Sequence, residues 1–205
     1  MLFNNICDKN TLMKQIINDI CHTIIKNDYK IVLISGNGCA GKSIFANLLK
    51  GKYQDFNKTV CILDTDDFLL DKEYRKSTII SYVDKKGQVK KGYMASTFPQ
   101  AYDFEKLKNT IIGKNQDLII IEGIGAAFVL NDFPQAYKIF LQIDRETEFR
   151  RRSQRARSEA DLSKERIEMR YEQFELFVLP LADKFDLRLV SQNDFSLKLT
   201  KEKER

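Results

Sequence analysis

The chain has 205 residues, of which 43% are hydrophobic and 31% charged. This length suits one α/β domain, and this composition excludes a collagenous, low-complexity or wholly disordered chain. The chain carries 34 basic and 29 acidic residues, and its net charge of +5 favours anionic ligands. Its four cysteines lack metal-ligand spacing, and no apolar run approaches the roughly 20 residues that span a bilayer. With no secretory signal at the N-terminus, we expect a reduced, cytoplasmic protein that has no membrane partner.

Helical and extended patterns alternate along the chain. Apolar residues spaced three to four apart predict an amphipathic helix over residues 11–25. Short apolar runs predict buried strands over residues 31–34, 59–63, 118–121, 138–143 and 185–191, with a helix over 42–51 after the first strand. Because parallel strands need long crossover connections, we expect an α/β fold with a parallel five-stranded sheet flanked by helices.

Two segments fall outside this alternation. Residues 78–95 contain two extended runs around a charged, glycine-containing turn, which predicts a hairpin or flap. The charged residues 201–205 are expected to form a frayed tail. No linker-like composition or internal repeat divides the chain, so we expect a single domain over residues 1–205.

A glycine-rich segment follows the first predicted strand and precedes a predicted helix. It fits the spacing GxxxxGK[ST] of a phosphate-binding loop (P-loop), with the residues Gly36, Asn37, Gly38, Cys39, Ala40, Gly41, Lys42 and Ser43. Backbone N–H groups of such a loop wrap phosphates, and the N-terminus of the next helix favours their charge. Lys42 would neutralise the β- and γ-phosphates, and Ser43 would bind magnesium. We therefore predict a nucleoside triphosphate, ATP first, together with Mg²⁺.

Three carboxylates follow the second predicted strand, namely Asp64, Asp66 and Asp67. Acidic side chains at the carboxyl end of a strand indicate a site in an α/β protein. An acceptor hydroxyl needs a proton acceptor near the transferred phosphoryl group, so Asp66 is the favoured catalytic base. Asp64 and Asp67 remain competitors, and a turn or a helix cap is the structural alternative.

The motifs taken together resemble the uridine kinase-like or phosphoribulokinase superfamily of P-loop small-molecule kinases. After the P-loop come TDDF at residues 65–68, FPQAYD at 98–103 and IEG at 121–123. The resemblance implies that Asp66 is the base, that Asp103 binds the acceptor, and that Glu122 contributes to the magnesium site with Ser43. Tyr102, beside Asp103, would pack against the acceptor or belong to the core.

An arginine cluster follows the fourth predicted strand. The resemblance implies an arginine-bearing lid near residues 150–170, with Arg151 and Arg155 as catalytic arginines. Guanidinium groups on a lid can neutralise charge on the transferred phosphoryl while closure excludes water. The alternative, above all for Arg150 and Arg157, is a solvated helix face.

The chain departs from the family on the acceptor side. Only residues 104–117 separate Asp103 from the next predicted strand, which leaves no room for the family's base-recognition segment unless residues 78–95 replace it. Phe98 stands where the family has histidine, Leu69 replaces an aromatic residue, and Ala156 replaces an aspartate. A nucleoside such as uridine or cytidine is the first expected acceptor. Pantothenate, glycerate or another vitamin or sugar is the alternative.

The leading prediction is therefore an ATP- and Mg²⁺-dependent kinase for the hydroxyl of a small molecule. A nucleotide-dependent switch or regulatory protein is a second class, weakened for GTP because no N-K-x-D motif is present. Nucleic-acid binding through the arginine cluster is disfavoured because no aromatic residues are interleaved with the arginines and no recognised module supports it. Assembly into an oligomer is left open.

Overall fold

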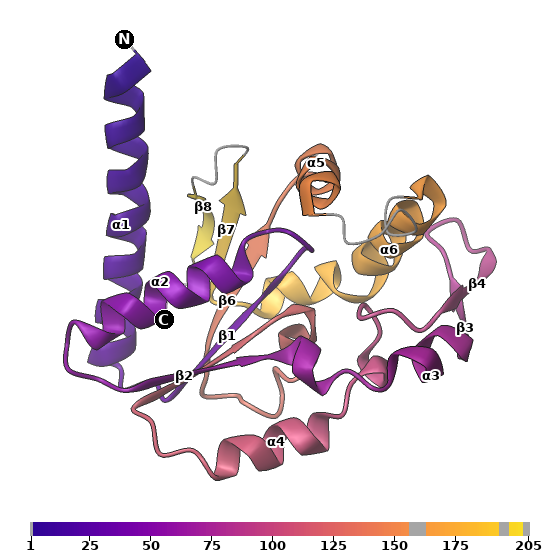
Figure 1. The fold of residues 1–205 in the computed structure, drawn as a ribbon, viewed down its shortest axis with the longest axis horizontal. Helices are drawn as coiled ribbons and strands as arrows, with labels where there is room; N and C mark the ends of the chain where they lie inside the picture. The colour runs from indigo at the N-terminus through magenta and orange to yellow at the C-terminus, as the bar shows by residue number, and fades with distance from the viewer. Residues whose placement is uncertain (1, 156–162, 193–196, 203–205) are drawn as a thin grey trace.

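The computed structural model describes residues 2–155, 163–192 and 197–202. Helices and strands alternate along most of this length (Figure 1). Among the described residues, no helix has both the length and the apolar character to cross a membrane. The helices are α1 Leu2–Lys26, α2 Lys42–Gln54, α3 Lys72–Ser77, α4 Phe104–Ile112, α5 Arg145–Arg155 and α6 Lys164–Phe177. The strands are β1 Ile31–Gly36, β2 Val60–Asp64, β3 Ile79–Val83, β4 Val89–Tyr93, β5 Leu118–Glu122, β6 Tyr137–Gln142, β7 Leu187–Ser191 and β8 Leu197–Glu202.

The central sheet has six strands in the order β2-β5-β1-β6-β7-β8. The first five are parallel, which confirms the predicted α/β fold with a parallel sheet. The sixth, β8, pairs antiparallel with β7, so the expected frayed tail is wrong for residues 201 and 202. The reason is that Leu197 packs into the core at the start of β8, while Lys198 beside it stays exposed.

Both faces of the sheet are covered by helices. Val32 and Ile34 of β1 point to a core that includes Ile24 of α1 and Leu49 of α2. Leu33, between them, points to a second core with Leu107 of α4 and Phe174 of α6. Because successive strand residues point to opposite faces, a continuous apolar run is what a doubly covered strand requires.

The segment expected to form a hairpin or flap contains the antiparallel pair β3–β4, separate from the central sheet. This hairpin is attached to α6 (Figure 1). The Tyr82 hydroxyl donates to Glu172 at 3.1 Å, and Lys90 Nζ donates to the same carboxylate at 2.8 Å. Just after β4, Thr97 Oγ1 donates to Gln173 at 2.9 Å. These contacts place the hairpin and α6 on the same side of the site described next.

Candidate active site

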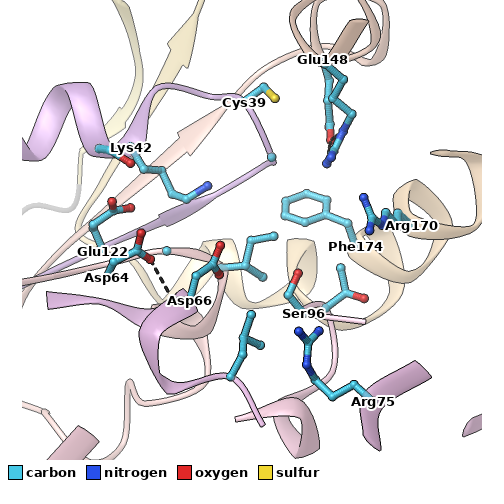
Figure 2. A pocket seen from close by; sticks show the side chains of 17 residues that line it. Cys39, Lys42, Asp64, Asp66, Arg75, Ser96, Glu122, Glu148, Arg170 and Phe174 are labelled. Atoms are coloured by element: carbon cyan, nitrogen blue, oxygen red, sulfur yellow. Dashed lines mark hydrogen bonds and ion pairs between the residues drawn. The ribbon is translucent and has the colours of Figure 1, made fainter. Parts of the chain in front are cut away.

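The carboxyl ends of β1, β2 and β5 meet at one edge of the sheet. In register, Ile34 pairs with Glu122, and Asp64 pairs with Glu122 from the other side. A cavity of about 480 Å³ lies at this edge (Figure 2). It is lined by Gly38, Cys39, Lys42, Ser43, Asp64, Asp66, Leu69, Arg75, Ser96, Thr97, Glu122, Gly123, Ile124, Glu148, Arg152, Arg170 and Phe174.

The P-loop is fixed to the end of β6. Gly36 has φ 139°, and a Cβ there would overlap the Leu141 carbonyl, so only glycine fits this approach. The N–H of Asn37 donates to the same carbonyl at 3.2 Å, and its side-chain oxygen accepts from the Ile143 N–H at 3.3 Å. The loop ends at Gly41, which has φ 90° and precedes α2. This geometry leaves the N-terminus of α2 facing the cavity, as an anion site requires.

Lys42 and two carboxylates form the charged centre of the cavity. Lys42 Nζ donates to the carbonyl oxygen of Asn37 at 2.7 Å, and burial lowers the pKa of its ammonium group against the opposing charges of Glu122 and Asp66. Glu122 is 4% exposed, and burial raises the pKa of its carboxyl although a hydrogen bond with Ser43 opposes this. Burial also raises the pKa of Asp64. Electrostatic interactions between these groups are therefore stronger than they would be in water.

The donor set suits Mg²⁺. The Ser43 hydroxyl lies beside the Glu122 carboxylate, with Asp64 across the strand pair. Within the described ranges, no group of three or more His, Cys, Asp or Glu side chains could hold a metal ion by itself. Mg²⁺ is usually bound through one or two carboxylates together with phosphate oxygens and water, rather than by an all-protein cage. Ser43 and Glu122 therefore fit the predicted magnesium site, with Asp64 beside them.

Asp66 is the acidic residue that reaches the cavity with an exposed side chain. It lies in a 3₁₀ turn, Thr65–Phe68, where its N–H donates to Asp64 Oδ1 at 2.8 Å. Asp64 thus caps the turn that carries Asp66, while Asp67 is exposed and does not line the cavity. Of the three candidates for the base, the geometry favours Asp66.

Asp103 and Tyr102 do not line the cavity, so Asp103 lacks its expected place beside the acceptor and Tyr102 follows the alternative of a core residue. Asp103 caps α4, where its Oδ1 accepts from the Lys106 N–H at 2.9 Å. Tyr102 is 6% exposed, and burial raises its pKa well above the usual value. Its hydroxyl donates to the Ser96 carbonyl at 2.7 Å. Helix capping and core packing explain both residues, and Tyr102 contributes to the site by positioning Ser96.

Two neighbouring arginines of α5, Arg151 and Arg152, line different cavities. Arg151 is 4% exposed and donates through Nη1 to the Cys39 carbonyl at 3.0 Å and through Nη2 to the Gln192 carbonyl. It therefore supports the P-loop from outside the main cavity. It borders a second cavity of about 360 Å³ that the residues Cys39, Gly41, Lys42, Ser43, Ile44 and Gln154 also line.

Arg152, the next residue, lines the main cavity instead of Arg151. Its Nε donates to Glu148 at 2.9 Å, and a Cβ at Gly38 would overlap its guanidinium group. Glu148 also accepts from the Asn37 side chain at 3.2 Å, which connects α5 to the P-loop. The side chain of Arg155, and residues 156–162 of the expected lid with Arg157, lie outside the described part of the chain.

Sequence reasoning missed the remaining wall of the cavity. Arg75 comes from α3, Ser96 and Thr97 follow β4, and Arg170 and Phe174 come from α6. The spacing of four between Arg170 and Phe174 places them on one helix face, which is a signal present in the sequence. Arg75 has no such signal, because only the path of the chain after Asp66 brings α3 to the cavity.

Fold and site together define an α/β protein with a phosphate-binding loop. A scan of protein-family models finds no match, and a search of curated proteins finds no relative. Among solved structures, the fold is similar to D-glycerate 3-kinase from Cryptococcus neoformans, with TM-score 0.51 and 10% identity over 90% of this chain and 99% of that one.

Two further structures resemble the chain less closely. One is a candidate fructose transport system kinase from Silicibacter sp. TM1040, with TM-score 0.48 and 14% identity over 82% of this chain and 92% of that one. The other is a candidate uridine kinase from Bacillus stearothermophilus, with TM-score 0.38 and 17% identity over 75% of this chain and 94% of that one. At these identities the D-glycerate 3-kinase likeness establishes a shared fold alone.

Proposed function

We propose that this protein is an ATP- and Mg²⁺-dependent kinase that transfers the γ-phosphoryl group to a hydroxyl of a small molecule. The observation that carries the proposal is the joint presence of a P-loop and an exposed carboxylate in one cavity. Lys42 and Asp66 both line it, and Asp66 lies in the turn that follows β2, whose last residue Asp64 pairs with Glu122 (Figure 2). A nucleotide switch has no hydroxyl acceptor and so needs no proton acceptor for one, which is the role that Asp66 would have in a kinase.

The residues divide the chemistry between them. The P-loop N–H groups and Lys42 would hold the β- and γ-phosphates, and Mg²⁺ at Ser43 and Glu122 would supply neutralising charge. The acceptor oxygen forms a bond to the γ-phosphorus while the bond to the β–γ bridging oxygen breaks. Asp66 accepts the proton that the acceptor hydroxyl loses. Arg152, beside Gly38, is placed to stabilise charge on the transferred group.

The acceptor proposed from the sequence is a nucleoside such as uridine or cytidine, with pantothenate, glycerate or another vitamin or sugar as the alternative. The two contacts that the resemblance implies for the acceptor, Asp103 and Tyr102, are taken up by a helix cap and by the core. The cavity wall opposite Lys42 is formed instead by Arg75, Ser96 and Arg170. Two arginines in this wall suit an acidic acceptor such as pantothenate or glycerate better than a neutral nucleoside, which supports the alternative.

The test is acceptor-stimulated release of ADP with each of these compounds, in the wild type and in Asp66→Asn. We expect Asp66→Asn to bind ATP as tightly as the wild type but to lose about 10²- to 10⁴-fold in kcat, because the proton acceptor is removed. The matched control is Asp67→Asn, which changes an exposed aspartate outside the cavity and is expected to retain activity. Near-normal turnover by Asp66→Asn would reject its role as the base, and hydrolysis unaffected by any acceptor would favour a switch.

A further inference from the structure

Two arginines from distant parts of the sequence share one end of the cavity. Arg75 comes from α3 and Arg170 from α6, and both line the cavity. Figure 2 shows them across the cavity from Lys42 and Glu122, with Ser96 between them and Asp66 nearer the P-loop side. Both are half-buried, so each positive charge is partly removed from water.

The two guanidinium groups are fixed in the same manner. Arg75 Nε donates to the Leu70 carbonyl at 2.8 Å, and Arg170 Nε donates to the Tyr93 hydroxyl at 3.0 Å. These bonds use the inner nitrogen of each group, which leaves the Nη1 and Nη2 edge to bind a ligand. A guanidinium edge of this kind matches the two oxygens of a carboxylate or phosphate.

Among the described residues, no carboxylate forms an ion pair with either guanidinium group at this end of the cavity, although Asp71 attracts Arg75 at longer range. Arg152, by contrast, is paired with Glu148. Two half-buried cations that face one cavity repel each other unless an anion lies between them. The arrangement therefore points to an anionic ligand group that the chain itself does not provide.

The remaining lining residues give this ligand an orientation. In the proposed function the ATP phosphates occupy the P-loop end at Lys42 and Ser43, so the charged group of the acceptor must lie at the arginine end. Leu69, Ile124 and Phe174 supply apolar surface to the same cavity, suited to the carbon skeleton between the two ends. A hydroxyl on that skeleton would then lie towards Asp66.

We propose that the phosphoryl acceptor carries a carboxylate or phosphate group, which Arg75 and Arg170 bind while its hydroxyl faces Asp66. This rests on the proposed kinase function and adds the class of acceptor, a hydroxy acid or a sugar phosphate. A neutral acceptor such as uridine leaves both guanidinium groups unpaired, and sites with unpaired charged groups discriminate strongly against such ligands.

The experiment uses matched probes that differ in charge. Glycerate is compared with glycerol, pantothenate with panthenol, and ribose 5-phosphate with ribose, with uridine as a further neutral acceptor. We expect only the anionic compound of a pair to stimulate ADP release. Stimulation by glycerate or pantothenate would identify a carboxylate site, and stimulation by ribose 5-phosphate would identify a phosphate site. Equal kcat/KM for the charged and neutral members of every pair would overturn the proposal.

Substitutions at Arg75 and Arg170 distinguish loss of the anion site from loss of the folded structure. In Arg75→Gln and Arg170→Gln we expect KM for the anionic probe to rise roughly 10- to 100-fold, since hydrogen bonds to charged groups are the strong ones. ATP affinity should stay unchanged, which also shows that the variants fold. Arg75→Lys keeps the charge but loses the paired donors, so it should recover part of the loss.

Arg166→Gln is the control, because Arg166 lies one turn before Arg170, donates through Nε to the same Tyr93 hydroxyl at 3.1 Å, and does not line the cavity. It should leave KM unchanged, and a rise as large as in Arg170→Gln would overturn the proposal.

A failure of the proposed kinase function can be distinguished from a failure of the anion site. If no probe stimulates ADP release, calorimetric titration of the same probes in the presence of a non-hydrolysable ATP analogue still tests the arginines. Binding of anionic probes that Arg75→Gln and Arg170→Gln abolish supports the anion site even without phosphoryl transfer. Absence of any binding preference for the anionic probes would reject it.

Discussion

Gly123, directly after Glu122, determines how closely two strand ends approach. It has φ 129°, and a Cβ there would overlap the Thr65 hydroxyl, which belongs to the turn carrying Asp66. Glycine therefore allows the β2 and β5 ends to bring Asp66 and Glu122 to the same cavity. A site that depends on this approach should tolerate no side chain at position 123.

We expect Gly123→Ala to lower the free energy of unfolding by at least about 1–3 kcal/mol, the usual cost of an unfavourable backbone conformation. Urea denaturation followed by circular dichroism measures this. Gly51→Ala is the matched control, because Gly51 lies in α2 with open space around its Cα. There alanine should stabilise by roughly 0.5–1 kcal/mol through its higher helix propensity. Equal effects at the two positions would contradict this account of Gly123.

At single positions, the sequence predicted where a side chain lies if the backbone fixes its place. The P-loop, Asp66 and Glu122 lie at or just after the ends of strands, so their place at the sheet edge could be predicted, while their roles stay a proposal. Asp103 could not be resolved in this way, because a carboxylate before a helix serves equally as cap or ligand, and here it caps α4. Arg151 and Arg152 are adjacent in sequence, yet the turn of α5 directs them to different cavities.

At the level of elements, the parallel strands were predicted within a few residues because each is a short apolar run. β8 was missed because its lysines and glutamate suggest a solvated tail, and only pairing with β7 reveals the strand. Helix α1 begins at Leu2 rather than at residue 11, because its first turns lack a clear apolar period. The structure of segments at the edge of the fold depends on pairing and packing with distant parts of the chain, and the local sequence pattern does not contain this information.

Asp117 joins the start of β5 to the start of β2. Its carboxylate accepts from the N–H and the hydroxyl of Thr59, both at 2.8 Å, and from Lys58 Nζ at 3.3 Å. The backbone hydrogen bond from Thr59 is the main cause that lowers the pKa of Asp117 from 3.8 to about 2. Because the charged form is favoured in the folded state, Asp117 stabilises the protein above its unfolded pKa.

This stabilisation should be lost as the pH falls from about 4 towards 2, when the folded state also takes up the proton. Urea denaturation of the wild type and Asp117→Asn between pH 6 and pH 3 measures the effect. The difference between their unfolding free energies should be constant above pH 5 and should shrink below pH 4. A difference independent of pH would show that the charge of Asp117 contributes nothing.

At the scale of the whole molecule, the sheet separates two hydrophobic cores, and they support different parts of the cavity. The core under α4 and α6 adjoins it through Phe174, which both packs on the sheet and lines the wall. The core under α1 and α2 lies on the opposite face of the sheet. The first core thus positions Phe174 in the cavity wall, while the second supports β1 and α2, which carry the P-loop. Sequence patterns predicted both cores but could not assign them to the two ends of the site.

Cys21 lies in the core under α1 and α2. Its accessibility to alkylation tests whether α1 and the sheet unfold together in one cooperative transition. Cys21 is fully buried among α1, α2 and the sheet, and burial raises the pKa of its thiol to about 11. Since the thiolate is the reactive form, Cys21 should resist alkylation at pH 8 until the protein unfolds. Cys39 and Cys61 are half-buried and serve as internal controls that react in native buffer.

Peptide mapping by mass spectrometry after iodoacetamide treatment measures each site separately. We expect labelling of Cys21 to follow the urea transition seen by circular dichroism, and MgATP to shift both transitions to higher urea, because a ligand that binds only the folded state stabilises it. Ile24→Ala, at a fully buried position one turn further along α1, should cost about 2–5 kcal/mol and shift both transitions to lower urea. Labelling of Cys21 well before the circular dichroism transition would show instead that α1 detaches while the sheet and P-loop stay folded.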